Sequence, residues 1–410
     1  MSTRVILLFT KVKTMKKVAV IGAGIAGITA AYFIARLGYK VTVIEQEKYP
    51  AMRTSFANGG QISVSNSEVW NTWSNVKKGV KWMFTKDAPL LVRPRWDHLS
   101  WLARFLWVTA TQDPNEHTKQ TIRLGLKSRQ LYKEMIKTEH LQFDQRHSGI
   151  LHFYRDHDYW AHSVRQSKYI YEDNGCEWTT FNSGVKTLDP ALEHFDSTTL
   201  GYAWTKDDWT GDIHKFCAEM RHVLKNKYDV DFCFDAQVAV LEHLQKFDVI
   251  VVAAGIGSVN LARSIGDSLP IYPVKGYSIT VNVREDQMHM IPKVSLLDDQ
   301  AKIVSSTLGN RFRVAGTAEF AGENYDIRRD RIEPLLRWIH DNFPNLDTSS
   351  YSSWACLRPM TPDMMPIVRQ SRKNAKVFYH TGHGHLGWTI SPATAHSVAK
   401  LVHEYLRKDT

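Results

Sequence analysis

The sequence predicts a two-domain α/β protein, and three observations lead to this prediction. Residues 17–45 read as a buried strand, a glycine turn, a helix and a second strand. Residues 376–406 hold another glycine-rich turn before an amphipathic helix, and residues 247–258 form a further strand and turn. A chain of 410 residues is also too long for one ordinary core. We therefore expect a discontinuous Rossmann-like nucleotide-binding domain plus an α+β domain with a mixed or antiparallel sheet.

The composition is that of a soluble globular protein, with 43% hydrophobic and 23% charged residues. A net charge of +10 fits nucleic acid, an anionic membrane or a basic proteome, but the chain has no recognisable nucleic-acid module, so we expect no nucleic-acid partner. Four scattered cysteines indicate no disulfide framework, no metal site and a reducing compartment. No apolar run is long enough to span a bilayer, and residues 1–14 read as an extension before Met15.

The segment KVAVIGAGIAGITAAYFIARLGYKVTVIE, residues 17–45, has the dinucleotide-binding fingerprint. Its first glycine allows a tight turn, its second lets a pyrophosphate approach the backbone, and its third lets helix and strand pack closely. The acid at the end of the second strand can accept from a ribose hydroxyl, which argues against NADP and leaves FAD and NAD. The expected cofactor contacts here are Gly22, Gly24, Ile25, Ala26, Gly27 and Glu45.

The second glycine-rich turn, in TGHGHLGWT at 381–389, also ends at a helix N-terminus, which favours negative charge. One dinucleotide has one pyrophosphate, so this turn can serve another part of the same cofactor. In a flavin that part is the N1/C2=O edge, which gains negative charge on reduction. The alternative is a plain surface turn shaped by glycine. The expected cofactor contacts are Gly384, Leu386, Gly387 and Thr389.

The middle of the chain is expected to return to the nucleotide-binding domain. FDVIVVAAGIGS, residues 247–258, reads as a buried strand with a glycine turn, and DVDFCFDAQVAV, residues 229–240, has a β pattern. Val238 and Gly255 are the expected cofactor contacts there. The expected domain ranges are 15–95, 208–265 and 350–410 for the nucleotide-binding domain, and 96–207 and 266–349 for the substrate domain.

Eight ordered motifs carry a family resemblance. They are VIGAGIAGI (20–28), TSFANGGQIS (54–63), KWMFTKDAPL (81–90), TGD (210–212), YPVKGYSIT (272–280), RVAGTAEFAG (313–322), LRPMTPD (357–363) and TGHGHLGWT (381–389). With them the chain resembles the small subunit of bacterial D-amino-acid dehydrogenases, within the amine-oxidising flavoproteins that include glycine oxidase and sarcosine oxidase. The resemblance implies FAD in the first domain and a sheet over the isoalloxazine ring in the second.

The resemblance also implies roles for single residues. Arg358 of the LRP motif corresponds to the arginine that binds the substrate carboxylate in glycine oxidase. A guanidinium matches a carboxylate bidentately, and Pro359 stiffens the backbone beside it. The alternative is a structural pair between Arg358 and Asp363. In TSFANGGQIS the expected flavin contacts are Ser55, Asn58, Gly60 and Gln61, unless the segment is merely a tight turn. We expect Lys275 and Tyr277 to face the substrate. The alternative is that Lys275 is simply exposed.

Two features depart from the family pattern or add to it. Cys356 stands where these dehydrogenases carry glycine, and a sarcosine-oxidase cysteine at the equivalent place bonds to the flavin. A covalent link at Cys356 is therefore a hypothesis beside the simpler one of a small buried residue. Residues 70–107 also gather six tryptophans among basic residues, including the amphipathic HLSWLARFLW, residues 98–107. This region either contacts the cytoplasmic face of the inner membrane or forms a Trp-rich core in a cytoplasmic protein.

The reaction implied is oxidative deamination of a D-amino acid. A hydride passes from Cα to flavin N5, and water hydrolyses the imine to a 2-oxo acid and ammonia. The electrons then pass to a quinone or another respiratory acceptor. No acid–base residue is assigned, because the flavin carries the chemistry while the protein orients the substrate. The alternatives are an oxygen-using oxidase of the glycine, sarcosine or D-proline/hydroxyproline type, an NAD-dependent dehydrogenase, and a non-catalytic FAD-bound module.

Overall fold

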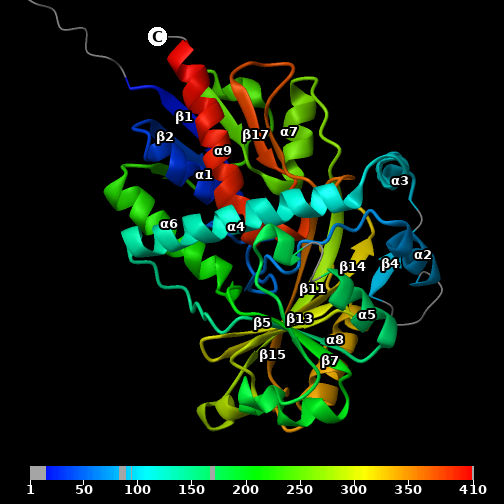
Figure 1. The fold of residues 1–410 in the computed structure, drawn as a ribbon. Helices are drawn as coiled ribbons and strands as arrows, with labels where there is room; N and C mark the ends of the chain where they lie inside the picture. Colours follow the sequence, from blue (N-terminus) through cyan, green and yellow to red (C-terminus); the bar gives the residue numbers. More distant parts are fainter. Residues whose placement is uncertain (1–14, 83–88, 94, 167–170, 409–410) are drawn as a thin grey trace, which may run out of the picture.

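The computed structural model describes residues 15–82, 89–93, 95–166 and 171–408 (Figure 1). Two large sheets organise the chain: the predominantly parallel sheet lies at one end of the molecule and the predominantly antiparallel sheet at the other. The mixed α/β fold with parallel and antiparallel strands confirms the predicted fold class.

The first sheet has six strands, five of them parallel, and combines the start, middle and end of the chain. From edge to edge it contains β16 (Ile367–Gln370), β17 (Val377–Thr381), β10 (Val249–Val252), β1 (Lys17–Ile21), β2 (Lys40–Ile44) and β9 (Asp231–Cys233). Only β16 runs antiparallel to its neighbour. The central strands β1 and β10 are short apolar runs because helices cover both faces of a parallel sheet. The predicted strand–turn–helix–strand unit therefore forms as expected.

The predicted β pattern over 229–240 is only partly correct. Strand β9 covers Asp231–Cys233, and residues 234–240 form no strand. Asp235 adopts a left-handed backbone with φ of 52°, and its N–H donates to the Glu47 carbonyl oxygen at 3.2 Å. This turn ends the edge strand after three residues, because a strand cannot continue through a left-handed residue.

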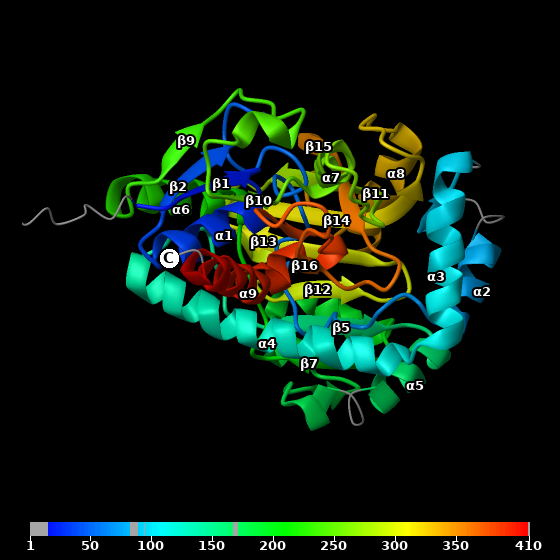
Figure 2. The ribbon, with the colours of Figure 1, turned by 90° about the horizontal axis from the view of Figure 1, so that it is seen from above.

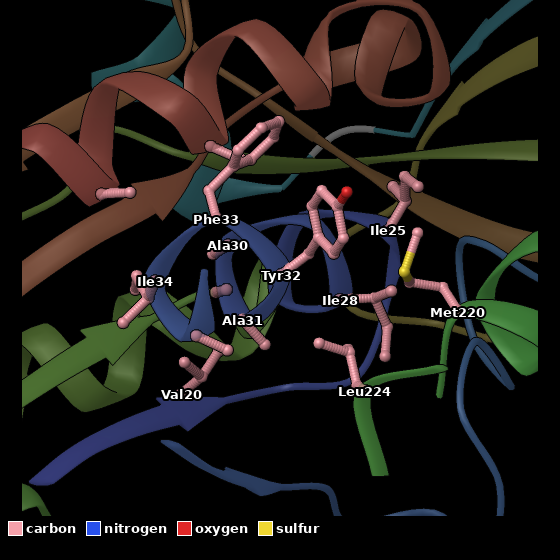
Figure 3. Packing of buried hydrophobic residues seen from close by; sticks show 14 of the residues in the cluster. Val20, Ile25, Ile28, Ala30, Ala31, Tyr32, Phe33, Ile34, Met220 and Leu224 are labelled. Carbon is pink, nitrogen blue, oxygen red and sulfur yellow. The ribbon is translucent and has the colours of Figure 1, made fainter. Parts of the chain in front are cut away.

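Helix α1 (Ile25–Ala35) has no polar face, because every residue of it except Ala26 is buried. It packs against α9 (Gly387–Lys408) and α6 (Ile213–Lys227), and α9 packs in turn against α4 (Pro114–Glu139). Figure 2 shows α9 between α1 and α4. Figure 3 shows α1 side chains such as Ile28 meeting Met220 and Leu224 of α6. A helix that is apolar all round must be enclosed on all sides, which fixes its place in the core.

The second sheet has nine strands and forms the other end of the molecule. In order it contains β15 (Tyr351–Met360), β11 (Tyr272–Asn282), β14 (Arg311–Phe320), β13 (Ile303–Leu308), β12 (Ser295–Asp298), β5 (Ile150–Tyr154), β7 (Gly201–Thr205) and β6 (Thr179–Phe181), with β4 (Leu90–Val92) paired to β14. Only the β12–β5 and β14–β4 pairs are parallel. Helix α8 (Arg329–Asn342) packs on β11 and β14.

The remaining elements surround these layers. They are α2 (Trp73–Trp82), α3 (Leu99–Thr111), α5 (His157–Gln166), α7 (Ser258–Ser264), the small sheet of β3 (Gln61–Ile62) with β8 (Trp209–Thr210), and short 3-10 turns that include η7 (Gly255–Gly257) and η9 (Gly384–Leu386). Figures 1 and 2 both place α2 and α3 together at one side of the molecule. No helix in the described part of the chain is both long and apolar enough to cross a bilayer.

How the chain divides into folding units remains our proposal, with residues 15–95, 208–265 and 350–410 in the FAD-binding unit. The sheets cross two of these boundaries: β4 and β15 fall inside those ranges but hydrogen-bond to strands of the nine-stranded sheet. These two strands therefore link the proposed FAD-binding ranges to the nine-stranded sheet by backbone hydrogen bonds.

Replacing Gly27 by alanine tests the close contact between α1 and the turn before it. An ideal Cβ there would lie 1.8 Å from the Gly22 carbonyl oxygen, so backbone must move. We expect Gly27→Ala to lower the free energy of unfolding by about 3 kcal/mol or more. The control is Gly257→Ala, whose Cβ meets only Ala254 Cβ at 3.6 Å, and we expect a change within about 0.5 kcal/mol. Urea unfolding that gives equal values for both variants would contradict this account.

Candidate active site

The first glycine turn is built to let another group approach the backbone. Gly22 has a φ of 101°, and an ideal Cβ there would lie 2.6 Å from the Ala253 carbonyl oxygen, so side chains are excluded. An ideal Cβ at Gly24 meets only Ser55 Oγ at 3.4 Å, which leaves the N-terminus of α1 open. The Glu45 carboxylate at the end of β2 is 9% exposed and accepts the Ala23 N–H at 2.6 Å. A carboxylate has lone pairs left for a ribose hydroxyl, so the turn fits a dinucleotide.

The second glycine turn meets the first. Gly387 begins α9, and an ideal Cβ there would lie 3.9 Å from Ile25 Cγ2 in the first turn of α1. His380 Nδ1 lies 3.0 Å from the Ala26 carbonyl oxygen, and because a carbonyl only accepts, this nitrogen carries a proton. The N-termini of α1 and α9 therefore lie next to each other. Both carry partial positive charge, so together they favour the anionic parts of one cofactor.

A cavity of about 1030 Å³ runs from this junction across the nine-stranded sheet. Its volume is at the upper end for a small-molecule site. The predicted residues that line it are Ile25, Ser55, Asn58, Gln61, Tyr277, Cys356, Arg358, Gly384, Leu386, Gly387 and Thr389. The predicted residues that do not line it are Gly22, Gly24, Ala26, Gly27, Glu45, Gly60, Val238, Gly255 and Lys275.

Val238 and Gly255, two of the residues that do not line the cavity, lie near the strand β10. Val238 is half-buried and packs against the apolar cluster on the outer side of β10. Gly255 has a φ of 56°, and nothing lies within 4 Å of an ideal Cβ there, so open space adjoins the turn after β10. Their roles as cofactor contacts remain predictions.

The segment at residues 54–63 is fastened to the nine-stranded sheet. Its carbonyl oxygens at Ala57 and Gly59 accept the hydroxyls of Ser278 and Ser306, each at 2.7 Å. The Gln61 amide donates to Ser295 Oγ at 2.8 Å. Nearer the first turn, Ser55 Oγ accepts the Ile25 N–H at 3.2 Å. The segment thus joins the N-terminus of α1 to three strands of the sheet and forms a wall of the cavity.

Arg358 lies on the surface of the sheet, inside the cavity. Its guanidinium covers Gly276 of the neighbouring strand, where an ideal Cβ would lie 2.3 Å from an arginine nitrogen. One of its N–H groups donates to the Thr317 carbonyl oxygen at 3.0 Å. Burial lowers the pKa of this guanidinium, and Cys356 partly opposes the shift, but arginine stays cationic at neutral pH.

Arg358 does not pair with Asp363 in the structure. The Asp363 carboxylate instead accepts the N–H of Met365 at 3.1 Å. Over the described residues, no carboxylate forms an ion pair with Arg358. A cation that lines a cavity without an acidic partner favours an anionic ligand.

Lys275 and Tyr277 are both buried, so the alternative of an exposed Lys275 is wrong. The Lys275 ammonium is 1% exposed and donates to Asn324 Oδ1 at 2.7 Å. The Tyr277 hydroxyl donates to the fully buried Glu319 carboxylate at 2.5 Å. Burial and this carboxylate raise the pKa of Tyr277. Tyr277 is among the residues that line the cavity, and Lys275 is not.

Cys356 is half-buried and lines the cavity beside Arg358. Burial raises the pKa of its thiol, and the Arg358 charge opposes that shift. The thiol form is therefore favoured at neutral pH, as expected for a cysteine in apolar surroundings. The covalent flavin link stays a hypothesis.

Several cavity residues were not singled out as site residues from the sequence. Buried polar atoms without a hydrogen-bond partner in the described chain line the cavity at Thr317 Oγ1, Trp354 Nε1, His385 Nε2 and Trp388 Nε1. Burial lowers the pKa of His385 to about 3, and its ring stacks on Trp70 with centroids 4.8 Å apart. Such unsatisfied groups normally indicate a missing ligand or water. Tryptophan and threonine occur throughout the chain, so only the folded structure shows which of them line the cavity.

Ser65, His152 and Asp299 form a hydrogen-bonded row in the same cavity, and it resembles a hydrolytic triad. Ser65 Oγ lies 3.0 Å from His152 Nε2, and His152 Nδ1 lies 3.1 Å from Asp299 Oδ2. The N–H groups of Val64 and Ser65 already donate to Asp208, so they cannot stabilise an oxyanion. The row is therefore better explained as a polar support for the cavity wall.

Gly276→Ala tests whether that glycine provides the space for Arg358. The new Cβ would overlap the guanidinium, so we expect the variant to lose about 1–3 kcal/mol of unfolding free energy. In an Arg358→Ala background the same change should cost less, because the overlapping group is gone. Urea unfolding of the four proteins gives the coupling, which we expect to be at least about 1 kcal/mol. Additive losses would show that Gly276 does not hold Arg358.

Comparison with known proteins agrees with this geometry. The family model described as DAO, FAD dependent oxidoreductase, matches residues 17–401. D-amino acid dehydrogenase 3 of Mesorhizobium japonicum is 45% identical over 407 residues, 95% of this chain and 97% of that protein. D-amino acid dehydrogenase of Dechloromonas aromatica is 35% identical over 94% of this chain and 96% of that protein.

Among solved structures, glycine oxidase from Geobacillus kaustophilus has a TM-score of 0.72 at 16% identity, covering 95% of both chains. L-proline dehydrogenase from P. horikoshii has a TM-score of 0.70 at 15% identity, covering 95% of this chain and 94% of that one. These two likenesses establish the fold alone. With the family match and the dehydrogenase relatives, they lead to one conclusion: this chain is an enzyme of the DAO family of FAD-dependent oxidoreductases, with FAD as its cofactor.

Proposed function

We propose that this enzyme oxidises D-amino acids to 2-oxo acids and ammonia. The observation that carries the proposal is Arg358, a cation in the cavity wall with no acidic partner in the described chain. An amino acid always presents a carboxylate, which a guanidinium binds through parallel N–H donors. The relatives named D-amino acid dehydrogenase, at 45% and 35% identity, support the choice of substrate class.

The chain's own residues can hold FAD at the two glycine turns. The open N-terminus of α1 suits the pyrophosphate, Glu45 suits a ribose hydroxyl, and the N-terminus of α9 beside Thr389 suits the flavin edge that becomes negative. When bound, FAD supplies an acceptor for the hydride that leaves the substrate. The cavity that residues 54–63 and the sheet help to line leaves room for the ring and the substrate.

Arg358 orients the substrate. Thr317 occupies one N–H of the guanidinium, and a guanidinium has five, so enough remain for both oxygens of a carboxylate. Because Gly276 lets the guanidinium lie flat on the sheet, its charge is held in one place before substrate arrives. The bound amino acid loses the Cα hydrogen with its electron pair and one N–H proton. Water then adds to the imine, and the nitrogen leaves as ammonia.

A second candidate is an oxidase that passes electrons to oxygen. Its support is fold likeness to proteins named glycine oxidase, at 16–17% identity. The relatives at higher identity are named dehydrogenases, which favours another acceptor. Peroxide formed in step with substrate use would identify the oxidase.

The electron acceptor that we propose is a membrane quinone, reached through the face made by α2, α3 and the residues before α3. Trp96 is 90% exposed, and Trp107 and Trp73 are also exposed. Lys77, Lys81 and Arg104 are exposed near them. Aromatic side chains among basic ones suit the interface of an anionic membrane.

The inner sides of the same helices line the cavity. Val76 and Trp82 of α2 and Leu102 and Phe105 of α3 belong to its lining, beside polar residues of α2 such as Asn75, so the cavity extends from that face towards Arg358. Trp101 is 5% exposed, and its Nε1–H donates to the Met360 carbonyl oxygen at 2.9 Å. The tryptophans therefore divide between core and surface.

Anaerobic reduction of the yellow enzyme by D-amino acids tests the proposed reaction. We expect bleaching of the flavin by D- but not L-amino acids, and a loss of about 100-fold or more in kcat/KM in Arg358→Ala, because a charged partner of the carboxylate is gone. Arg263→Ala, an exposed arginine outside the cavity lining, should behave like the unmodified enzyme. No bleaching by any D-amino acid would overturn the proposal.

Flotation with anionic liposomes tests the membrane face. The enzyme should float with vesicles that contain phosphatidylglycerol at low salt. Replacing Trp96 and Trp107 by serine should reduce the bound fraction several-fold, because their rings supply the apolar contact. Tyr49→Ser removes a ring that is 63% exposed elsewhere and should change nothing. Equal flotation of all three proteins would rule out this face.

A further inference from the structure

Thr317 of β14 has a backbone conformation that threonine rarely adopts. Its φ is 61°, in the left-handed region, where a β-branched side chain is crowded. The pairing of β11 with β14 shows the cause: Lys275 lies opposite Glu319 and Tyr277 opposite Gly316, so two β14 residues face one on β11. Thr317 is thus the extra residue of a β-bulge, a feature that commonly re-aims a side chain beside an active site.

The bulge lies next to Arg358 and contacts its guanidinium. Because Thr317 leaves the regular ladder, its carbonyl oxygen is free to accept the Arg358 N–H at 3.0 Å. The β11 residue across from the bulge is Gly276, the glycine under the guanidinium. The bulge therefore supplies an acceptor for Arg358, and Gly276 on the opposite strand leaves the space that the guanidinium occupies.

The Thr317 hydroxyl, unlike the carbonyl group, has no role in holding Arg358. The residue is 8% exposed and lines the cavity with Arg358. Its Oγ1 has no hydrogen-bond partner among the residues that the structure describes. A buried hydroxyl without a partner is costly, and a valine of the same shape would avoid that cost. A group that enters the cavity is therefore the expected partner.

We propose that Thr317 is a second substrate-binding residue, whose hydroxyl donates to the same carboxylate that Arg358 binds. This rests on the proposed function only in that the ligand is an amino acid. A carboxylate offers about four lone-pair sites, so it can accept from the guanidinium and from one hydroxyl together. Since the carbonyl oxygen that accepts from Arg358 and the hydroxyl belong to one residue, the bulge fixes the positions of the guanidinium and the hydroxyl relative to each other.

The test compares Thr317→Val with Thr317→Ser in the FAD-loaded enzyme. Valine keeps the branched shape and the carbonyl group but lacks the hydroxyl, whereas serine keeps the hydroxyl. The first probe is pyruvate, a 2-oxo acid that needs no turnover, titrated against the flavin absorption spectrum. The second is KM and kcat for the D-amino acid that reduces the enzyme fastest.

We expect Thr317→Val to raise the Kd for pyruvate and the KM about ten-fold, with kcat changed far less, and Thr317→Ser to stay within about two-fold of the unmodified enzyme. Unchanged pyruvate binding by the valine variant would overturn the proposal, as would equal weakening by serine, which would indicate a purely structural role. Absence of pyruvate binding by the unmodified enzyme would also overturn it. If the valine variant does not fold, Thr317→Ala removes the hydroxyl with less crowding.

The two proposals fail in different ways. If no D-amino acid reduces the unmodified enzyme, the proposed reaction is wrong, yet the pyruvate titrations still measure the contact between hydroxyl and carboxylate. If D-amino acids reduce the enzyme and the valine variant binds pyruvate normally, the reaction stands and the role of Thr317 does not.

Discussion

The burial of α1 is the constraint on which the rest of the structure depends. A helix without a polar face has to be enclosed, and the six-stranded sheet, α6 and α9 enclose it. Gly22 and Gly27 allow the contact, since a side chain at either position would overlap backbone. Once α1 and α9 pack side by side, their N-termini lie together. Two glycine turns that are far apart in the sequence thereby become one binding region for FAD.

The second sheet supplies what the first one lacks, a charged and shaped surface for the substrate. Its strands carry Arg358, Tyr277 and Thr317 on the wall of one cavity. The segment at residues 54–63 joins the two parts, through Ser55 at the N-terminus of α1 and through backbone oxygens bound by serines of the sheet. The cavity thus lies where the cofactor-binding end and the substrate-binding sheet meet.

The charged groups around Arg358 leave its guanidinium free to bind an anionic ligand. Glu319, the acidic residue of β14, is already engaged by Tyr277, Lys275 and Arg93. Arg358 itself is held by a carbonyl oxygen, which positions the guanidinium without neutralising it. A cation kept in place but unpaired is suited to a ligand that brings its own negative charge. The lining from α2 and α3 extends the cavity from this charge towards the exposed aromatic face.

The sequence by itself determined the nucleotide-binding unit, the FAD family and the arginine that faces the cavity, because glycine spacing and short apolar runs act over a few residues. It did not reveal that Lys275 is buried or that the tryptophans divide between core and surface. It also did not reveal that Gly276 leaves space for the Arg358 guanidinium and that the Thr317 carbonyl oxygen accepts from it. These depend on the register between β11, β14 and β15. Register is decided by packing among strands distant in the chain, and a bulge in one of them leaves no local pattern.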